Sequence, residues 1–315
     1  MKVRAILNPR AGVGAHRTRK AVEHGHPSWN DYAVYLTREP GHATELAQEA
    51  VAGGADLVLA VGGDGTVNEV SRGLLGSQVA LGIVPAGSGN GLARALRLPL
   101  RPDRALASLA SGVRRRIDVG LLNGLPFLNM AGAGFDAVVG HAFHERGRRG
   151  GRRGLLGYVR LVLGGLRSYR ASPLTITSGG EQLDLEPFIL TFANGPQYGS
   201  GAVINPGGRL DDGWLEVVTF EQRSLLRVLA AAPLLFLGGL ERTAGYRRLQ
   251  VTSATVTARR PIAVHRDGDP DQPTERIEIE VRPLALEIVV PAATAADPAG
   301  PFTQPGAAKP IVPQT

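Results

Sequence analysis

Twice within the first hundred residues, an apolar run of strand length ends at a glycine-rich turn and a helical pattern follows at once. Leu57–Val61 leads into Gly62-Gly63-Asp64-Gly65-Thr66 and a helix over 66–75, and Val79–Val84 leads into a second turn and a helix over 92–96. Strands and helices that alternate in this way predict a parallel sheet covered by helices on both faces. Such a sheet binds its ligand at the carboxyl ends of its strands.

The chain divides into an α/β half and a β-rich half. Strands at 3–7 and 32–36 and helices at 42–52 and 104–111 extend the alternating pattern. After residue 118, short β-rich runs separated by turn residues predict an antiparallel sandwich or barrel. These runs cover 126–130, 174–177, 187–192, 214–219, 250–258, 277–281 and 285–290, with helical stretches at 155–169 and 225–240.

We therefore predict three segments. Residues 1–118 form a Rossmann-like, doubly wound α/β domain, and residues 119–290 form an antiparallel β-sandwich domain. Residues 291–315 are rich in Pro, Ala and Gly, and we expect them to form a disordered tail.

The charge balance indicates an anionic partner. The 315 residues carry a formal net charge of +7, and basic proteins favour nucleic acid, lipid surfaces or phosphorylated ligands. The absence of cysteine excludes disulfides and thiolate chemistry and fits a reducing cytoplasm. The longest apolar run, Val228–Leu240, has 13 residues, whereas a membrane span needs about 20, so we expect no transmembrane helix.

The first glycine turn, residues 62–66, contains an aspartate where a phosphate would be expected to lie. Glycines let the backbone approach a ligand, and the N–H groups that open the next helix favour phosphate. Asp64 fits such a site if Mg²⁺ bridges it to phosphate oxygens, or if it faces an incoming hydroxyl and acts as a base. The alternative is an ordinary turn, because Asp and Gly are common turn residues.

The second glycine turn, residues 85–91 (PAGSGNG), also joins a strand to a helix. Ser88 and Asn90 can donate hydrogen bonds to phosphate oxygens, and Gly87, Gly89 and Gly91 leave space for them. The sequence lacks the Walker pattern of a P-loop. Two phosphate-binding turns on neighbouring strands are more specific than either alone, and they favour phosphoryl transfer from a nucleotide.

With further motifs, these residues resemble the diacylglycerol kinase catalytic family, which includes bacterial lipid kinases and sphingosine kinases. Residues 8–12 (NPRAG) are similar to its NP-x-x-G, residues 62–70 to its GGDGT-x-NEV, and residues 85–94 to its P-x-GT-x-N-x-x-AR, with Ser88 in the threonine position. Downstream, residues 132–137 (GAGFDA), 194–201, 210–213 (LDDG) and 267–269 (DGD) follow the family pattern.

The resemblance implies a two-lobed, ATP- and Mg²⁺-dependent lipid kinase of the NAD kinase and diacylglycerol kinase fold type. Asp267 is then the expected base on the lipid hydroxyl, and Asp64 lies at the junction with Mg-ATP. Asp212, with Asp211, matches a structural Mg²⁺ site. The implied nucleotide-binding residues are Asn8, Pro9, Thr37, Gly62, Gly63, Asp64, Gly65, Thr66, Asn68, Glu69, Gly87, Ser88, Asn90 and Asp269.

Two departures from the family pattern affect these expectations. Asp269 replaces the family's glutamate, which shortens the side chain by one methylene, and Pro270 follows it. Contacts from this carboxylate to nucleotide or metal are therefore in question. Gly208 stands where the family usually has alanine.

A basic segment over 145–153 (ERGRRGGRR) contains five arginines. Charge runs are usually solvated loops. The sharper hypothesis is a membrane contact, in which Arg148, Arg149, Arg152 and Arg153 bind anionic lipid. Nucleic acid is disfavoured because no aromatic residue interleaves with the arginines.

We therefore predict an ATP- and Mg²⁺-dependent lipid kinase that acts peripherally at the cytoplasmic face of the membrane, on a hydroxyl such as that of diacylglycerol. One alternative is a soluble kinase of the NAD kinase type, which shares the first turn. Another is a nucleotide-binding membrane-surface protein without turnover. An exposed strand edge in the β-rich half could pair two subunits into a homodimer.

Overall fold

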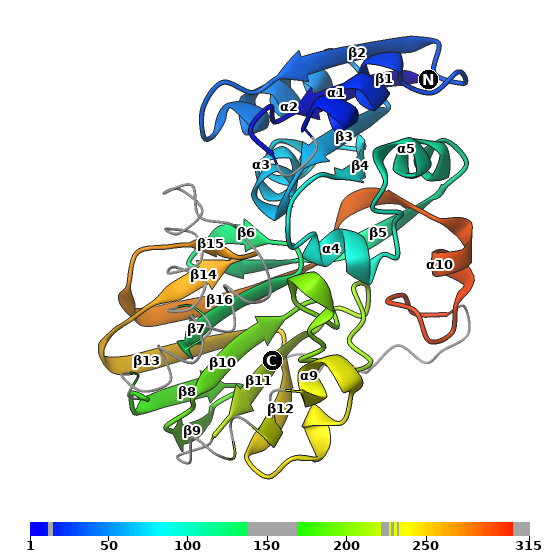
Figure 1. The fold of residues 1–315 in the computed structure, drawn as a ribbon. Coiled ribbons are helices and arrows are strands. Elements are labelled where there is room, and N and C mark those ends of the chain that lie inside the picture. Colours follow the sequence, from blue (N-terminus) through cyan, green and yellow to red (C-terminus); the bar gives the residue numbers. More distant parts are fainter. Residues whose placement is uncertain are drawn as a thin grey trace.

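Four parallel strands form the first half of a large sheet in the computed structural model, which describes residues 1–11, 15–135, 171–221 and 233–304, together with 137, 169, 227, 230 and 231. The strands run in the order β2-β1-β3-β4 (Figure 1). β3 and β4 are buried along their whole length, which explains their uninterrupted apolar sequence. Their bounds are β1 Lys2–Leu7, β2 Asp31–Leu36, β3 Leu57–Gly62 and β4 Ala80–Pro85.

Helices cover both faces of these strands. α2 packs against α3 on one side, and α1 packs against α5 on the other. The sequence pattern did not predict α1, whose residues are mostly polar. The bounds are α1 Ala15–His24, α2 His42–Ala52, α3 Asp64–Leu74, α4 Gly91–Ala95 and α5 Pro102–Ala110.

A single long strand, β16 (Thr274–Val290), joins the two halves of the chain. It pairs with β4 in parallel, with Ile288 opposite Leu81, and with β13 and β5 in antiparallel fashion. The sequence predicted two strands here. The register with β5 shifts between Arg282 and Leu286, around Pro283, so the chain bends there without leaving the sheet. The parallel and antiparallel parts therefore form one continuous sheet, β2-β1-β3-β4-β16-β13-β8-β9.

A second, antiparallel sheet packs on the antiparallel half of the first and completes the predicted sandwich. Its order is β12-β11-β10-β7-β14-β15. Apolar side chains from both sheets, among them Phe127, Phe192 and Ile277, fill the space between them. The remaining bounds are β5 Val113–Leu122, β6 Leu125–Phe127, β7 Met130–Gly134, β8 Leu174–Ser178, β9 Glu181–Leu185, β10 Ile189–Ala193, β11 Leu215–Phe220, β12 Tyr246–Val251, β13 Ser253–Ile262, β14 Val264–Arg266 and β15 Asp269–Pro270.

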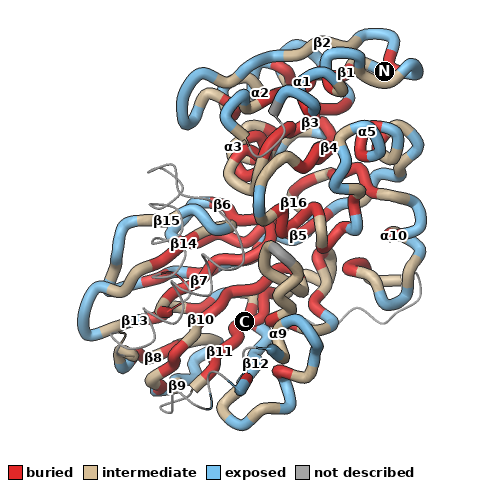
Figure 2. Tube along the Cα trace, in the orientation of Figure 1, coloured by how far each residue is buried: buried red, intermediate tan, exposed pale blue. Residues whose placement is uncertain are grey.

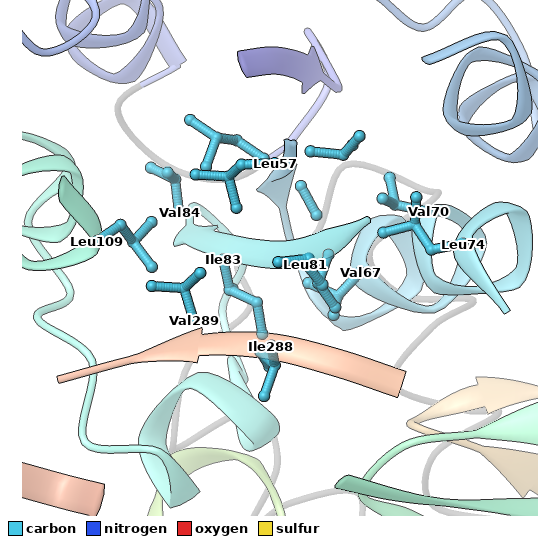
Figure 3. Close-up of a cluster of buried hydrophobic side chains, with 14 of the residues drawn as sticks. Leu57, Val67, Val70, Leu74, Leu81, Ile83, Val84, Leu109, Ile288 and Val289 are labelled. Atoms are coloured by element: carbon cyan, nitrogen blue, oxygen red, sulfur yellow. The ribbon is translucent and has the colours of Figure 1, made fainter. Parts of the chain in front are cut away.

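The largest core lies under the parallel strands, as the continuous red of β3 and β4 in Figure 2 shows. At the junction between the halves, Ile83 of β4 and Ile288 of β16 lie in the same buried cluster as Leu109 of α5 (Figure 3). The predicted fold, a doubly wound α/β domain followed by an antiparallel sandwich, is confirmed. The predicted boundary at residue 118 falls inside β5, which runs through the junction.

The prediction of a disordered tail is wrong for residues 291–304. The short helix α10 (Ala292–Ala296) is anchored by Thr294, whose Oγ1 donates to the Leu96 carbonyl (3.0 Å). Phe302 is fully buried, and the Leu210 amide donates to the Pro301 carbonyl (2.8 Å). Phe302 and these hydrogen bonds therefore dock the segment, although its composition is rich in Pro and Ala. Residues 305–315 lie outside the described residues.

The two predicted helical stretches have different outcomes. The stretch at 155–169 lies outside the described residues apart from Tyr169. Within 225–240, the structure describes a short helix, α9 (Leu234–Leu237), followed by a 3-10 turn, η2 (Leu240–Arg242). Another 3-10 turn, η1 (Gly199–Gly201), lies between β10 and β11. Over the described ranges, no helix is long and apolar enough to cross a membrane.

Candidate active site

The carboxyl ends of the parallel strands bring the predicted segments to one edge of the sheet. Asn8 follows β1, Thr37 follows β2, and the two glycine turns follow β3 and β4. Asn8 Nδ2 donates to Thr66 Oγ1 (3.2 Å), and Asn8 Oδ1 accepts from the Arg10 amide (2.9 Å). The residues that the motifs singled out in the first half of the chain therefore gather at the edge where ligands bind such sheets.

A hollow of about 670 Å³ lies beside this edge, between the end of β2 and helix α2. Pro9, Thr37, Arg38, His42 and Glu49 are among the residues that line it. Its volume lies within the range of small-molecule sites.

The two glycine turns pack against each other through their backbones. A Cβ added to Gly87 would lie 2.6 Å from the Gly63 Cα, and one added to Gly62 would lie 2.4 Å from Thr66 Oγ1. Gly87 is required because the Gly63 backbone is too close for a side chain, whereas Gly62 faces the side chain of Thr66 in its own turn. Helix α3 begins at Asp64, directly after Gly63, so its unpaired N–H groups open at this edge and favour an anion.

Asp64 lies where the two turns meet. Its Oδ1 accepts a hydrogen bond from the Gly91 amide (2.7 Å), and a Cβ on Gly89 would lie 3.0 Å from its Oδ2. Burial, together with the negative charges of Asp267 and Asp269, raises the pKa of Asp64 to about 7. A carboxyl group that titrates near neutral pH can hold a cation when ionised and can also accept a proton.

Asp267 comes from the sandwich, at the left-handed position (φ 49°) that follows β14. Its Oδ1 accepts hydrogen bonds from the amides of Asn129 (2.9 Å) and Met130 (3.1 Å). Its Oδ2 accepts from the amide of Leu128 (2.9 Å) and from Asn68 Nδ2 (2.8 Å). Each carboxylate oxygen therefore has two donors, which fix the side chain in one position.

Asn68 joins the two halves of the molecule at this point. It is buried on α3, and Nδ2 also donates to the Pro126 carbonyl (2.9 Å), while Oδ1 accepts from Arg72 Nε (2.9 Å). Because Arg72 can only donate, it determines which way the Asn68 amide points. The motifs did not single out Arg72. The spacing of Asp64, Asn68 and Arg72 could have identified it, since residues four apart share one face of a helix.

Asp269 reaches the first glycine turn despite its shorter side chain. A Cβ on Gly65 would lie 2.5 Å from Asp269 Oδ2. Nearby, Arg266 donates to Asp271 Oδ2 through Nε (3.0 Å) and Nη2 (2.9 Å). Three carboxylates from both halves of the chain, those of Asp64, Asp267 and Asp269, therefore face the start of α3.

The second glycine turn also contacts the sandwich. A Cβ on Gly199 would lie 2.9 Å from the Gly89 Cα, and one on Gly91 would lie 2.8 Å from Asn129 Nδ2. The two halves of the molecule thus meet through glycines at this turn. This close approach places the Asp267 turn against the parallel sheet.

Two predicted nucleotide-binding residues have other partners in the structure. Asn90 Oδ1 accepts from the Gly87 amide (2.9 Å) and Nδ2 donates to the Gly87 carbonyl (2.8 Å), so this side chain closes the second turn on itself. Glu69 Oε2 accepts from the Ala43 amide (3.3 Å) at the start of α2. Ser88 is exposed at the tip of the second turn.

The predicted structural metal site has one ion-paired member. Asp211 accepts hydrogen bonds from Arg115 (2.8 Å) and from the Thr303 amide (2.7 Å). Burial raises the pKa of Asp212, and it raises that of nearby Asp118 to about 6. Within the described ranges, no group of three or more His, Asp or Glu side chains has the arrangement of a metal site.

The predicted membrane contact is not described by the structure. Arg148, Arg149, Arg152 and Arg153 lie outside the described residues.

Comparisons with known proteins agree with this geometry. The model of the diacylglycerol kinase catalytic domain matches residues 2–122, and that of the YegS C-terminal NAD kinase beta sandwich-like domain matches residues 129–290. The chain is 32% identical over 297 residues to a Pseudomonas aeruginosa protein named "Probable lipid kinase YegS-like", which covers 92% of this chain and 95% of that one.

Two further relatives extend the comparison. The chain is 30% identical over 306 residues to a diacylglycerol kinase of Mycobacterium tuberculosis, with 92% of this chain and 95% of that one covered. A crystal structure titled as a "putative diacylglycerol kinase" from Bacillus anthracis superposes with a TM-score of 0.75 at 25% identity, covering 93% and 98% of the two chains. The two matched domains, the full-length relatives and the two-lobed site confirm the resemblance seen in the motifs, and the chain belongs to the diacylglycerol kinase and YegS-like lipid kinase family.

Proposed function

We propose that this protein is an ATP-dependent lipid kinase that transfers the γ-phosphoryl group to a lipid hydroxyl such as that of diacylglycerol. The observation that carries the proposal is the convergence of Asp64, Asp267 and Asp269 on two glycine turns at the carboxyl ends of the parallel strands. Phosphoryl transfer needs positioning, charge neutralisation and one proton acceptor, and this arrangement can supply each of them.

The glycine turns would bind the triphosphate. The unpaired N–H groups at the start of α3 would donate to phosphate oxygens, and the close packing of Gly63 and Gly87 would hold the two turns together beside them. The hollow lined by Pro9 and Thr37 would take the base and sugar. Asn90 would then shape the second turn, while the exposed hydroxyl of Ser88 would donate to phosphate.

The carboxylates at this edge also fit Mg²⁺. The pKa of Asp64 rises to about 7 because it is buried and because Asp267 and Asp269 add negative charge, and a divalent cation would relieve that repulsion. Magnesium takes one or two carboxylates together with phosphate oxygens and water, so a protein-only cluster of three ligands is not required. Asp64 and Asp269 would hold the ion, which would neutralise charge on the phosphates.

The geometry favours Asp64 over Asp267 as the proton acceptor. The four donors around Asp267 occupy both of its oxygens, so a hydroxyl proton would have to displace one of them. Asp64 accepts hydrogen bonds from the backbone amides of Gly91 and Asn90, and burial together with the nearby carboxylates still raises its pKa to about 7. In this proposal, Asp267 positions the acceptor side of the site and Asp64 accepts the proton.

The test uses ATP labelled in the γ-phosphate, Mg²⁺ and vesicles that contain diacylglycerol, a sphingoid base or a prenol, followed by organic extraction. We expect label in the organic phase, and we expect Asp64→Asn to abolish it. A parallel reaction offers NAD. Labelled NADP with an unlabelled organic phase would instead support the soluble kinase, and no product in either reaction would favour a protein without turnover.

A further inference from the structure

Helix α9 presents its apolar tip to solvent. Phe236 is 50% exposed and Leu237 is 81% exposed, the highest value for a large hydrophobic residue in the described part of the chain (Figure 2). These two adjacent residues give the short helix an exposed apolar end. A surface of this kind indicates a contact with a membrane or with another protein.

The exposure is fixed by the fold. The other side of α9, Leu234 and Leu235, packs against a buried cluster that includes Phe220 and Leu240. The Val203 amide donates to the Leu235 carbonyl (2.7 Å), which ties α9 to the segment after η1. Gly238 and Gly239 then turn the chain with φ of 83° and 95°, in the left-handed region that glycine adopts without strain. The buried cluster therefore holds α9 through Leu234 and Leu235, and Phe236 and Leu237 remain exposed to solvent.

The surroundings of this tip are basic. Between residues 227 and 248 the sequence has four arginines and one glutamate, a net charge of +3. Arg227 is exposed, and the Arg242 side chain is 87% exposed, with its Nε 3.8 Å from the Glu241 carboxylate. An apolar tip within a basic surface matches an anionic bilayer, where arginines bind headgroups and apolar side chains enter the interface.

The same buried cluster reaches the candidate active site. Met130, one of its members, donates its amide to the Asp267 carboxylate (3.1 Å). Tyr198 also packs against the cluster and directly precedes η1, whose Gly199 approaches Gly89 in the second glycine turn. A lipid surface at α9 would therefore contact the sandwich sheet that also carries the Asp267 turn.

We propose that Phe236 and Leu237 insert into the surface of an anionic membrane, with Arg227 and Arg242 on the headgroups. The proposal rests on the proposed lipid kinase function only for its biological purpose, since binding to vesicles can be measured without any reaction. It names a membrane contact separate from the basic segment at 145–153.

The test is co-sedimentation with vesicles of phosphatidylcholine containing about one third phosphatidylglycerol. We expect Leu237→Glu to weaken binding about tenfold or more, because burying one leucine contributes roughly 1.5–3 kcal/mol and 1.4 kcal/mol is a factor of ten. Leu100→Glu is the matched control, since Leu100 is 42% exposed and lies in the parallel half of the molecule. Thermal unfolding of both variants should match that of the unsubstituted protein.

Three results would overturn the proposal. The first is that the unsubstituted protein does not bind these vesicles. The second is that Leu237→Glu binds as tightly as the unsubstituted protein, and the third is that Leu237→Glu and Leu100→Glu lose the same amount of binding. Loss of a self-associated species in Leu237→Glu, with vesicle binding unchanged, would assign the tip to a second copy of the chain. If binding depends on Leu237 while no lipid is phosphorylated, the membrane contact stands and the proposed kinase function fails. Phosphorylation of vesicle lipid at the same rate by Leu237→Glu would support the kinase and reject the contact.

Discussion

The turn that carries Asp64 and the turn that carries Asp267 place two aspartates in one site in opposite ways. Asp267 has four hydrogen-bond donors, three of them backbone amides of consecutive residues in the sandwich. Asp64 accepts from the Gly91 amide, lies close to other carboxylates, and has a pKa raised to about 7. Four donors hold the Asp267 carboxylate, whereas the backbone hydrogen bonds to Asp64 from Gly91 and Asn90 do not offset its burial and the nearby negative charges.

This difference shows that a sequence motif can identify an aspartate of the site without showing which role that aspartate has. Asp267 is surrounded by groups that would be left unpaired without it, so its removal should damage both the fold and the site. Asp64 is destabilised by its neighbours, so its removal should damage the function and relieve the fold. Such a trade-off between stability and activity is expected at a site that binds metal and phosphate.

The largest effect is expected for Asp267→Ala. Three backbone amides and the Asn68 amide would lose their acceptor, and an unsatisfied buried donor costs about 1–3 kcal/mol, so we expect a loss of at least about 3 kcal/mol. Activity should fall by at least about a hundredfold. Urea unfolding measures the first effect and the labelled-phosphate assay the second.

The control for this change is Asp103→Ala. Asp103 forms an exposed ion pair with Arg101 (2.8 Å), and its removal should leave the stability close to that of the unsubstituted protein, because exposed ion pairs contribute little. A stability of Asp267→Ala equal to that of Asp103→Ala would show that the four hydrogen bonds to Asp267 do not stabilise the fold.

Asp64→Asn should give the opposite pattern, with activity lost and stability gained. Because the folded-state pKa of Asp64 is raised above its unfolded value, the native protein binds the extra proton, and its stability falls as pH rises from about 4 to about 7. The variant lacks this loss, so its advantage should be absent near pH 4 and reach on the order of 1 kcal/mol or more above pH 7. Thermal unfolding across this pH range measures it, and a destabilised variant at pH 8 would contradict the assignment.

The pH dependence of the reaction sharpens the same comparison. If Asp64 accepts the proton, kcat/KM should fall about tenfold for each pH unit below the pKa of about 7. The measurement is kcat/KM for Mg-ATP at saturating lipid between pH 5 and 9, because this ratio reports the pKa of Asp64 before Mg-ATP binds. A rate that stays constant down to pH 5 would remove Asp64 from this role.

A smaller effect is expected for Arg72→Met. This change removes the donor that orients Asn68 and leaves Asn68 free to turn its oxygen toward Asp267. We expect kcat to fall about tenfold, since misplacing a positioning group by one contact costs roughly that much, while KM for ATP stays the same. Arg72→Lys, which keeps a donor and the charge, should recover part of the loss. If kcat of Arg72→Met is unchanged, Arg72 is not needed to orient Asn68.

The sequence predicted the glycine turns well because their chemistry is local. Gly62, Gly63 and Gly87 lie in turns that a strand–turn–helix pattern already implies, and the structure places these turns at the ends of β3 and β4. The fold class followed from the alternation of strands and helices in one half and the short β-rich runs in the other. These features depend on neighbours in the sequence.

What the sequence did not predict depends on partners far along the chain. The Asn68–Asp267 hydrogen bond spans 199 positions, and no local pattern indicates it. The single strand β16 was predicted as two because Pro283 interrupts the apolar pattern, although neighbouring strands hold the chain on both sides. The segment 291–304 was expected to be disordered because it is rich in Pro, Ala and Gly. Its composition does not show that Phe302 is buried in the core.

The most direct test of this comparison is the titration of Asp64 itself. Protein labelled with ¹³C at the aspartate carboxyl carbon would be followed by NMR from pH 4 to 9, without nucleotide or Mg²⁺. The resonance missing from Asp64→Asn identifies the group. We predict a midpoint at a pH of about 7 and a fall in that midpoint when Mg-ATP is added. A midpoint near 4, the ordinary value for aspartate, would contradict the account, because Asp64 would then not be the destabilised carboxylate of the pair.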